Sequence, residues 1–192
     1  MVDTARRREI EDIATELFRR QGYVATSVRD IASVLGIQGA SLYAHITSKE
    51  DVLWAIVDRA ADRFEAAAAA TDGPRDPVAR LEALARAHVA AIAEDVDAAG
   101  VFVSEWRSLG PERRAAILER RDAYERRIRE VIADGMATGA FRMTDPALAA
   151  RFILGALNAI ARWYDPGGRL SPDRIADHAA GFVLAALTDG PS

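Results

Sequence analysis

Apolar residues recur along this chain at spacings of three and four, the period of an amphipathic helix. In the first such segment, residues 4–20, the apolar positions Ile10, Ala14, Leu17 and Phe18 share one face. The strict alternation of apolar and polar residues that is typical of β-strands is scarce. The pattern therefore predicts an all-α protein whose helices are separated by Gly, Pro and Ser or Asp signals.

Two short helices, residues 27–35 and 38–44, follow the first, and a longer helix begins at Ser48 and reaches about residue 70. The segment TDGPRDP, residues 71–77, is the clearest linker. Beyond it the pattern predicts helices near 77–94, 97–108, 111–138, 146–165 and 172–188, two of which follow the N-cap pairs Asp145-Pro146 and Ser171-Pro172. We predict an N-terminal three-helix domain, residues 1–47, and a larger helical domain, residues 48–192.

The segment 26–45 has the pattern of a helix-turn-helix. Ser27 and Asp30 have capping-box spacing, and Gly36 can adopt the positive φ that a sharp turn between helices needs. Apolar residues that pack the two helices together stand at Val28, Ile31, Ala32, Leu35, Ile37 and Leu42. The outer side of the second helix is small and uncharged, as contact with base edges requires, and consists of Gln38, Gly39, Ala40 and Ser41. The alternative is a surface turn of a helical bundle.

Residues 17–53, LFRRQGYVATSVRDIASVLGIQGASLYAHITSKEDVL, resemble the N-terminal DNA-binding domain of the TetR family of transcriptional regulators. The resemblance implies that Thr26, Ser27, Tyr43 and His45 contact phosphates and that residues 38–41 face bases. Ile46 stands where phenylalanine is usual, a departure that concerns packing. The tail, residues 161–187, resembles TetR regulators of fatty-acid, aromatic-acid and steroid breakdown, which favours an acyl-CoA effector.

Two further basic residues are candidates for phosphate contacts. Arg29 occupies an exposed position of the first helix of the motif, although a solvated surface arginine fits the same position. Lys49 is the only lysine in the sequence and follows Ser48, where the first turn of the long helix presents free N–H groups. We therefore predict that Lys49 contacts the DNA backbone, with an incidental surface lysine as the alternative.

The last two helices predict a dimer. Residues 146–164 are apolar on nearly all sides, which is typical of a helix that is covered all round. Small residues that allow another helix to approach closely are Gly155, Ala156, Ala159, Ala180, Gly181 and Ala185. We predict a homodimer through these helices, as the resemblance also implies; an ordinary monomer core is the alternative.

The larger domain offers candidates for a ligand pocket between helices. They are the aromatic residues Phe64, Phe102, Trp106, Tyr124 and Phe152, and Asn158, the only asparagine, which stands mid-helix among apolar residues. An ordinary core explains the aromatics equally, and Asn158 could meet a ligand, a backbone carbonyl or its dimer mate. The arginine-dense helix 111–130 predicts an ion-paired face, part of which could bind an anionic effector.

Composition excludes several classes of site. The sequence has no cysteine, which excludes disulfides, thiolate zinc sites and cysteine nucleophiles. His45, His88 and His178 have no second ligand at metal spacing, so we predict no metal site and place His88 and His178 on a helix surface or at an interface. There is no secretory signal and no apolar run of membrane-spanning length, which predicts a soluble, cytoplasmic protein without membrane contact.

Net charge is −4, but residues 1–50 are balanced, so DNA binding depends on where the basic groups lie. Gly-rich phosphate loops and the hydrolase motifs H-E-x-x-H and G-x-S-x-G are absent, so we predict no enzyme, no catalytic residue and no cofactor. The prediction is a repressor that binds a palindromic operator in double-stranded DNA and is released by a small-molecule effector. The alternatives are a repressor that responds to drugs or other hydrophobic ligands, and a helical interaction module without DNA binding.

Overall fold

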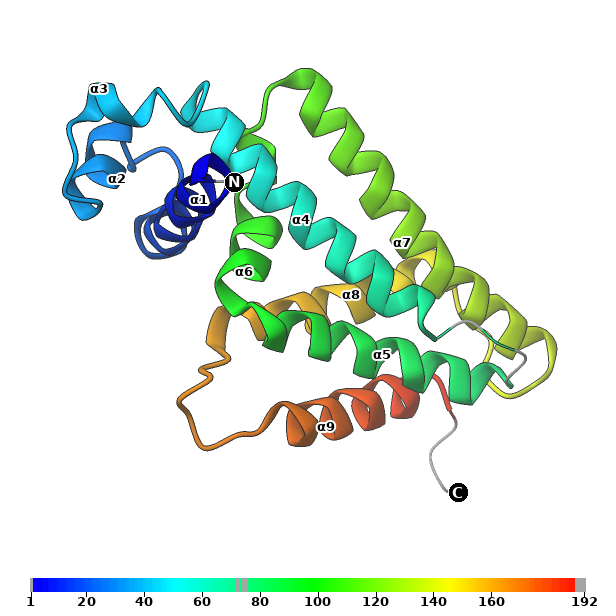
Figure 1. The fold of residues 1–192 in the computed structure, drawn as a ribbon. Coiled ribbons are helices and arrows are strands. Elements are labelled where there is room, and N and C mark those ends of the chain that lie inside the picture. Colours follow the sequence, from blue (N-terminus) through cyan, green and yellow to red (C-terminus); the bar gives the residue numbers. More distant parts are fainter. Residues whose placement is uncertain (1, 72, 74–75, 189–192) are drawn as a thin grey trace. The chain divides into compact units, whose positions relative to one another are not determined.

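The computed structural model describes residues 2–71, 73 and 76–188, and their regular structure is entirely helical, as predicted (Figure 1). None of these helices is long and apolar enough to cross a membrane. The chain forms two compact units, one containing residues up to 61 and 97–118, the other 62–96 and the residues from 119 onward. Residues 48–61 thus fold with the N-terminal helices, while the functional boundary after residue 47 stays a prediction.

The first unit contains the short helices of the N-terminal motif. Its elements are α1 (Val2–Gln21), α2 (Val28–Val34), α3 (Gly39–Leu42), the first part of α4 (Lys49–Ala69), nearly all of α6 (Val96–Ser104), the 3₁₀ turn η1 (Trp106–Ser108) and the first part of α7 (Pro111–Ala137). The predicted helix limits agree with these bounds to within a few residues, except that one segment, 97–108, is divided into α6 and η1.

Local signals in the sequence set the helix-turn-helix. Gly22 and Gly36 have φ values of 85° and 66°, which L residues with a β-carbon adopt reluctantly, and they end α1 and α2. The core beneath the turn is closed by large side chains that are at most 1% exposed: Ile10, Phe18, Ile31 and Leu42. Ile46 is 3% exposed, so an aliphatic residue fills the position where the resemblance suggests phenylalanine.

The second unit contains α5 (Pro77–Glu94), α8 (Pro146–Trp163), α9 (Pro172–Ala185) and the remaining parts of α4 and α7. Helix α5 packs against α8 and α9 (Figure 1). The predicted caps are present: Asp145 accepts from the N–H of Ala147 at 2.8 Å, and the Ser171 hydroxyl accepts from the N–H of Arg174 at 3.3 Å. These caps fix where the two predicted dimer helices begin.

Candidate functional site

Helix α3 presents a small, uncharged surface. Leu42 is fully buried beneath it, whereas the side chains of Gln38, Ala40 and Ser41 are exposed. Gly39 is half-buried beside Arg29, since a β-carbon at Gly39 would lie 3.8 Å from Arg29 Cγ. Three of the four residues predicted to face bases are therefore accessible, and the exposed Arg29 lies next to them.

The start of α2 places two predicted phosphate contacts in different surroundings. Thr26 is 1% exposed; its hydroxyl donates to the Gly22 carbonyl at 2.8 Å and accepts from Gln21 Nε2 at 3.1 Å. Ser27 is exposed and forms the predicted capping box, in which its N–H donates to the Asp30 carboxylate at 2.7 Å. The backbone and then the hydroxyl hydrogen bond from Ser27 lower the pKa of Asp30. Ser27 is thus accessible, whereas the Thr26 side chain is engaged by the turn.

Tyr43 and His45 lie in the turn that directly follows α3. Tyr43 is the C-cap of that helix and is 57% exposed. His45 is half-buried, and its backbone N–H donates to the Leu42 carbonyl at 2.9 Å. A phenol hydroxyl at this exposure can reach a phosphate beside the groove that α3 would enter.

Lys49 has close partners within the protein. Its ammonium donates to the carbonyl oxygens of Tyr23 at 2.8 Å and Thr26 at 2.7 Å, and lies 4.0 Å from the centroid of the Tyr23 ring. Burial lowers the pKa of Lys49, and the nearby Asp30 carboxylate acts in the opposite direction. Both carbonyls belong to the turn between α1 and α2, and main-chain partners of this kind leave no signal in a sequence.

Glu50 and Asp51, which follow Lys49 in α4, accept hydrogen bonds from α1 and from the start of α7. The Glu50 carboxylate accepts from the backbone N–H of Gly110 at 3.0 Å. Asp51 accepts from Arg7 of α1 and from Arg113 of α7, both at 3.1 Å. The first turn of α4 is therefore bonded to α1, to the α1–α2 turn and to the start of α7.

A second carboxylate in this unit also binds two arginines. Glu11 is only 5% exposed and accepts from Arg7 at 3.1 Å and from Arg59 at 2.8 Å. The hydrogen bond with Glu11 is the largest contribution that raises the pKa of Arg7. This cluster was not predicted from the sequence, although the four-residue spacing of Arg7 and Glu11 indicates their pair.

The second unit contains an uncharged polar pair, the buried His88 and the half-buried Tyr124. His88 is 3% exposed, so its predicted place on a helix surface or at an interface is wrong; Nδ1 lies 3.1 Å from the Tyr124 hydroxyl. Burial lowers the pKa of His88 to about 4, opposed by the nearby Asn158 amide and reinforced by Arg121. The Phe64 ring centroid lies 4.8 Å from that of His88. His88 is therefore a neutral imidazole at neutral pH.

A cavity of about 470 Å³ opens beside this pair. It is lined by Glu65, Ala68, Ala69, Glu119, Arg120, Ala123, Tyr124 and Arg127. Burial raises the pKa of Tyr124, so its phenol stays protonated where it meets the cavity. The helices α4 and α7 thus supply a space with apolar, acidic and arginine side chains around one neutral hydroxyl.

Only some of the predicted pocket residues come together. Phe64 and Tyr124 lie in the second unit with ring centroids 6.3 Å apart, and Asn158 lies near the same His88 ring. Phe102 and Trp106, each 7% exposed, belong to the first unit. Phe152 is 78% exposed, so it does not lie in a pocket between the helices of this unit, contrary to the prediction from the sequence.

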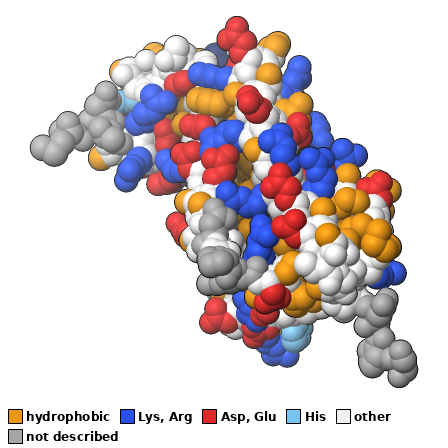
Figure 2. Space-filling view, turned by 90° about the vertical axis from the view of Figure 1, so that its right-hand side faces the viewer, with side chains coloured by type: hydrophobic (Ala, Val, Ile, Leu, Met, Phe, Trp, Pro, Cys, Tyr) orange, Lys and Arg blue, Asp and Glu red, His pale blue; other side chains and the backbone are white. Residues whose placement is uncertain are grey.

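Arginines of α7 are ion-paired, as the sequence predicted. Arg120 binds Glu65 at 2.7 Å and Asp62 at 2.6 Å, and Glu125 accepts from Arg151 of α8 at 3.2 Å. Basic and acidic side chains are interspersed over the face drawn in Figure 2. This surface therefore does not form a patch of one sign.

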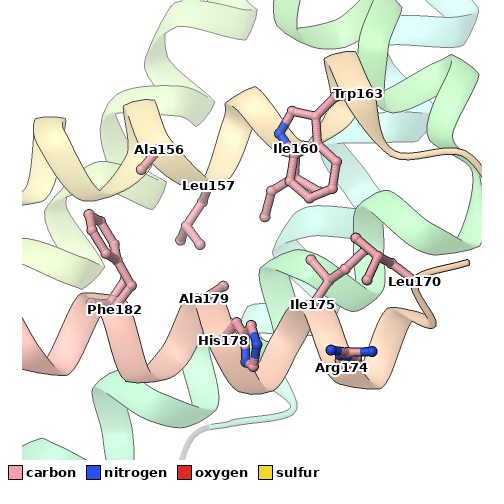
Figure 3. A pocket seen from close by; sticks show the side chains of 11 residues that line it. Ala156, Leu157, Ile160, Trp163, Leu170, Arg174, Ile175, His178, Ala179 and Phe182 are labelled. Carbon is pink, nitrogen blue, oxygen red and sulfur yellow. The ribbon is translucent and has the colours of Figure 1, made fainter.

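Helices α8 and α9 carry a row of exposed apolar side chains. The largest are Phe152 at 78%, Phe182 at 66% and Trp163 at 54% exposure. A groove of about 250 Å³ runs between the helices, and Leu157 of α8 and Phe182 of α9 point into it (Figure 3). A β-carbon at Gly155 would meet nothing within 4 Å, so another helix can approach there. Exposed aromatics on adjacent helices are typical of an interface.

Comparison with known proteins matches both halves of the chain to one family. Residues 10–56 match bacterial regulatory proteins of the tetR family, and residues 74–187 match the tetracyclin repressor-like C-terminal domain. The chain is 33% identical to the transcriptional repressor KstR2 of Rhodococcus jostii over 190 residues, which cover 96% of this chain and 92% of that protein.

Solved structures agree with this assignment. KstR2 of Mycobacterium tuberculosis superposes with a TM-score of 0.84 at 30% identity, covering 96% of each chain. AibR in complex with isovaleryl coenzyme A and operator DNA superposes with a TM-score of 0.82 at 31% identity, covering 93% of this chain and 98% of AibR. The chain therefore belongs to the TetR family of bacterial transcriptional regulators.

Proposed function

We infer that this protein is a transcriptional repressor that binds a palindromic operator as a homodimer and is released by a small-molecule effector. The observation that carries this is the accessible, uncharged face of Gln38, Ala40 and Ser41 above the buried Leu42. Glutamine can hydrogen-bond to adenine, serine to several bases, and alanine can touch a thymine methyl. The similarity to KstR2 of Rhodococcus jostii and of Mycobacterium tuberculosis supports the same role.

The proposed DNA contacts divide into two groups. Gln38, Gly39, Ala40 and Ser41 face bases, with glycine allowing close approach of the backbone. Ser27, Arg29, Tyr43 and His45 bind phosphates, whereas the buried Thr26, whose hydroxyl is bonded to Gly22 and Gln21, supports the start of α2. Phosphate contacts fix the position of α3 on the duplex, and the base contacts select the sequence.

We propose that α8 and α9 form the dimer interface. Their exposed aromatics and the open approach at Gly155 support this assignment. A dimer is needed because a palindrome has two half-sites, which face the same side of the duplex when they are about 34–36 Å apart. The cytoplasm, where the chromosome lies, is the proposed location.

We propose an acyl-CoA as the effector, bound at the cavity between α4 and α7. Arg120 and Arg127 at its wall suit phosphates, and the ring of Tyr124 with the alanines beside it suits an acyl chain. AibR, which this chain resembles, binds isovaleryl coenzyme A and operator DNA. The tail resemblance to regulators of fatty-acid and steroid breakdown points to the same ligand class.

The proposed release is a shift between two dimer conformations. One spaces the two α3 helices for successive major grooves, and the effector binds the other more tightly. The protein itself performs no chemical step in this mechanism, and so needs no catalytic residue or cofactor.

Selection of duplexes from a random library tests DNA binding directly. The purified full chain should enrich a palindrome, and a Gln38→Ala, Ser41→Ala double variant should bind it at least tenfold more weakly at the same salt. An acyl-CoA panel, with free fatty acids and hydrophobic drugs as controls, then tests release. Absence of any enriched palindrome would refute the repressor, and release by drugs alone would refute the acyl-CoA assignment.

A further inference from the structure

The feature that the DNA contacts above leave unexplained is Lys49. Its ammonium has three N–H donors, two of which are directed at the carbonyl oxygens of Tyr23 and Thr26, at 2.8 and 2.7 Å. The Tyr23 ring takes a further side of the ammonium, 4.0 Å from its centroid. A phosphate would therefore have to displace protein partners in order to bind Lys49 fully.

The segment that Lys49 holds is the turn that leads into the helix-turn-helix. The Thr26 carbonyl directly precedes Ser27, the N-cap of α2, so its position sets where α2 begins. The Tyr23 ring packs edge-on against Phe18 of α1, with centroids 5.2 Å apart. One side chain at the start of α4 thus fixes the end of α1 and the entry to α2.

The same turn of α4 is held from its other side. Glu50 accepts from the Gly110 N–H and Asp51 accepts from Arg113, both near the start of α7. The first turn of α4 is therefore bonded both to the start of α7 and, through Lys49, to the turn before α2.

We propose that Lys49 is a positioning residue, which orients α2 and α3 through the carbonyls of Tyr23 and Thr26 and acts on operator affinity without binding a phosphate. The proposal rests on the repressor function inferred above.

Three variants of the full-length protein test the proposal. Lys49→Met keeps the aliphatic stem and removes the donors, whereas Lys49→Arg keeps the charge on a planar group that cannot reproduce the ammonium geometry. Arg29→Gln is the control for a phosphate contact. Affinity is measured for the selected palindrome and for a random duplex of equal length, each over a range of salt concentrations. Hydrogen exchange of residues 22–35 is measured in the protein without DNA.

We expect Lys49→Met and Lys49→Arg to weaken palindrome binding by roughly tenfold or more, in line with loss of charged hydrogen bonds. Their salt slopes and their random-duplex affinity should stay unchanged, and residues 22–35 should exchange faster. Arg29→Gln should lower the salt slope by about one unit and leave exchange unchanged. Should Lys49→Met fail to fold, Lys49→Arg carries the comparison alone.

The opposite pattern would overturn the proposal. A direct phosphate contact would appear as a slope lower by about one unit in Lys49→Met, restored in Lys49→Arg. Unchanged exchange at residues 22–35 in both variants would also refute positioning. If the parent protein selected no palindrome, the repressor function would fail, and the exchange comparison would decide by itself whether Lys49 orders this turn.

Discussion

Among the described residues, the most buried titratable groups of the two units differ in charge. In the first unit Glu11 binds two arginines, as does the half-buried Asp51, and these bonds tie α1, α4 and α7 together. In the second unit His88 and Tyr124 are both uncharged. Separating a buried charged pair leaves an unpaired charge, whereas an uncharged group can exchange one hydrogen-bond partner for another at low cost. A buried carboxylate thus ties helices of the first unit together, whereas the most buried titratable group described in the second unit is neutral.

The largest predicted effect is the loss of folding stability on acidification, which protonates His88 of the second unit. Its pKa in the folded protein is about 4, below the value of about 6.5 in an unfolded chain, so the unfolded state binds more protons between these values. The contribution of His88 to the free energy of unfolding is therefore fully present above about pH 6.5 and is lost as the pH falls toward 4. We expect a loss of about 3 kcal/mol by pH 4.

Replacement of the imidazole isolates this effect. Urea unfolding of the parent and of His88→Gln, measured between about pH 7.5 and 4, should show the steeper decline in the parent. Glutamine retains hydrogen-bonding capacity and does not titrate, and carboxylate effects are common to both proteins. Parallel curves would mean that His88 is accessible to protons in the folded state.

Glu11→Gln should have the second largest effect. It removes the charge that Arg7 and Arg59 share, and the carboxylate is only 5% exposed. Because both arginine side chains are about 40% exposed, we expect a loss of about 2 kcal/mol, below the roughly 3–5 kcal/mol for a fully buried pair. Urea unfolding at neutral pH measures it.

The matched control is Glu9→Gln on the same helix. Glu9 pairs with Arg6 but its side chain is 52% exposed, so the change should stay within about 0.5 kcal/mol. Equal losses for the two variants would show that burial of Glu11 contributes nothing.

The smallest effect should come from the ion pairs of the second unit. Arg120 binds Glu65 and Asp62, whose side chains are 46% and 69% exposed. We expect Arg120→Gln to cost about 0.5 kcal/mol at low salt and less at high salt, because exposed pairs are screened. A loss above that of Glu11→Gln, or one that salt does not reduce, would contradict the contrast between the units.

Elements governed by neighbouring residues could be predicted from the sequence. Ser27 and Asp30 form their capping box within one turn, and Gly36 supplies its own positive φ. The uncharged face of α3 follows from the same local pattern, because Leu42 fixes which side is buried. These features depend on contacts a few residues apart, which the spacing of the sequence records directly.

Features made by distant segments could not be predicted in the same way. Lys49 meets main-chain oxygens 26 and 23 residues away, and no residue type marks a free carbonyl. The exposure of Phe152 depends on how helices from distant parts of the chain pack around α8. His88 is different, since it continues the buried stripe of Leu81, Leu84 and Ala85 at helical spacing; periodicity could have revealed its burial.

The exposed groove between α8 and α9 has a consequence for gene dosage. If two copies must meet to cover it, the number of operator-competent dimers in a dilute pool rises with the square of the chain concentration. Halving synthesis would then remove about three quarters of the dimers, well beyond a proportional loss. A cell with few copies of this protein would thus pass from silenced to expressed promoters over a narrow range of protein abundance, even before any effector binds.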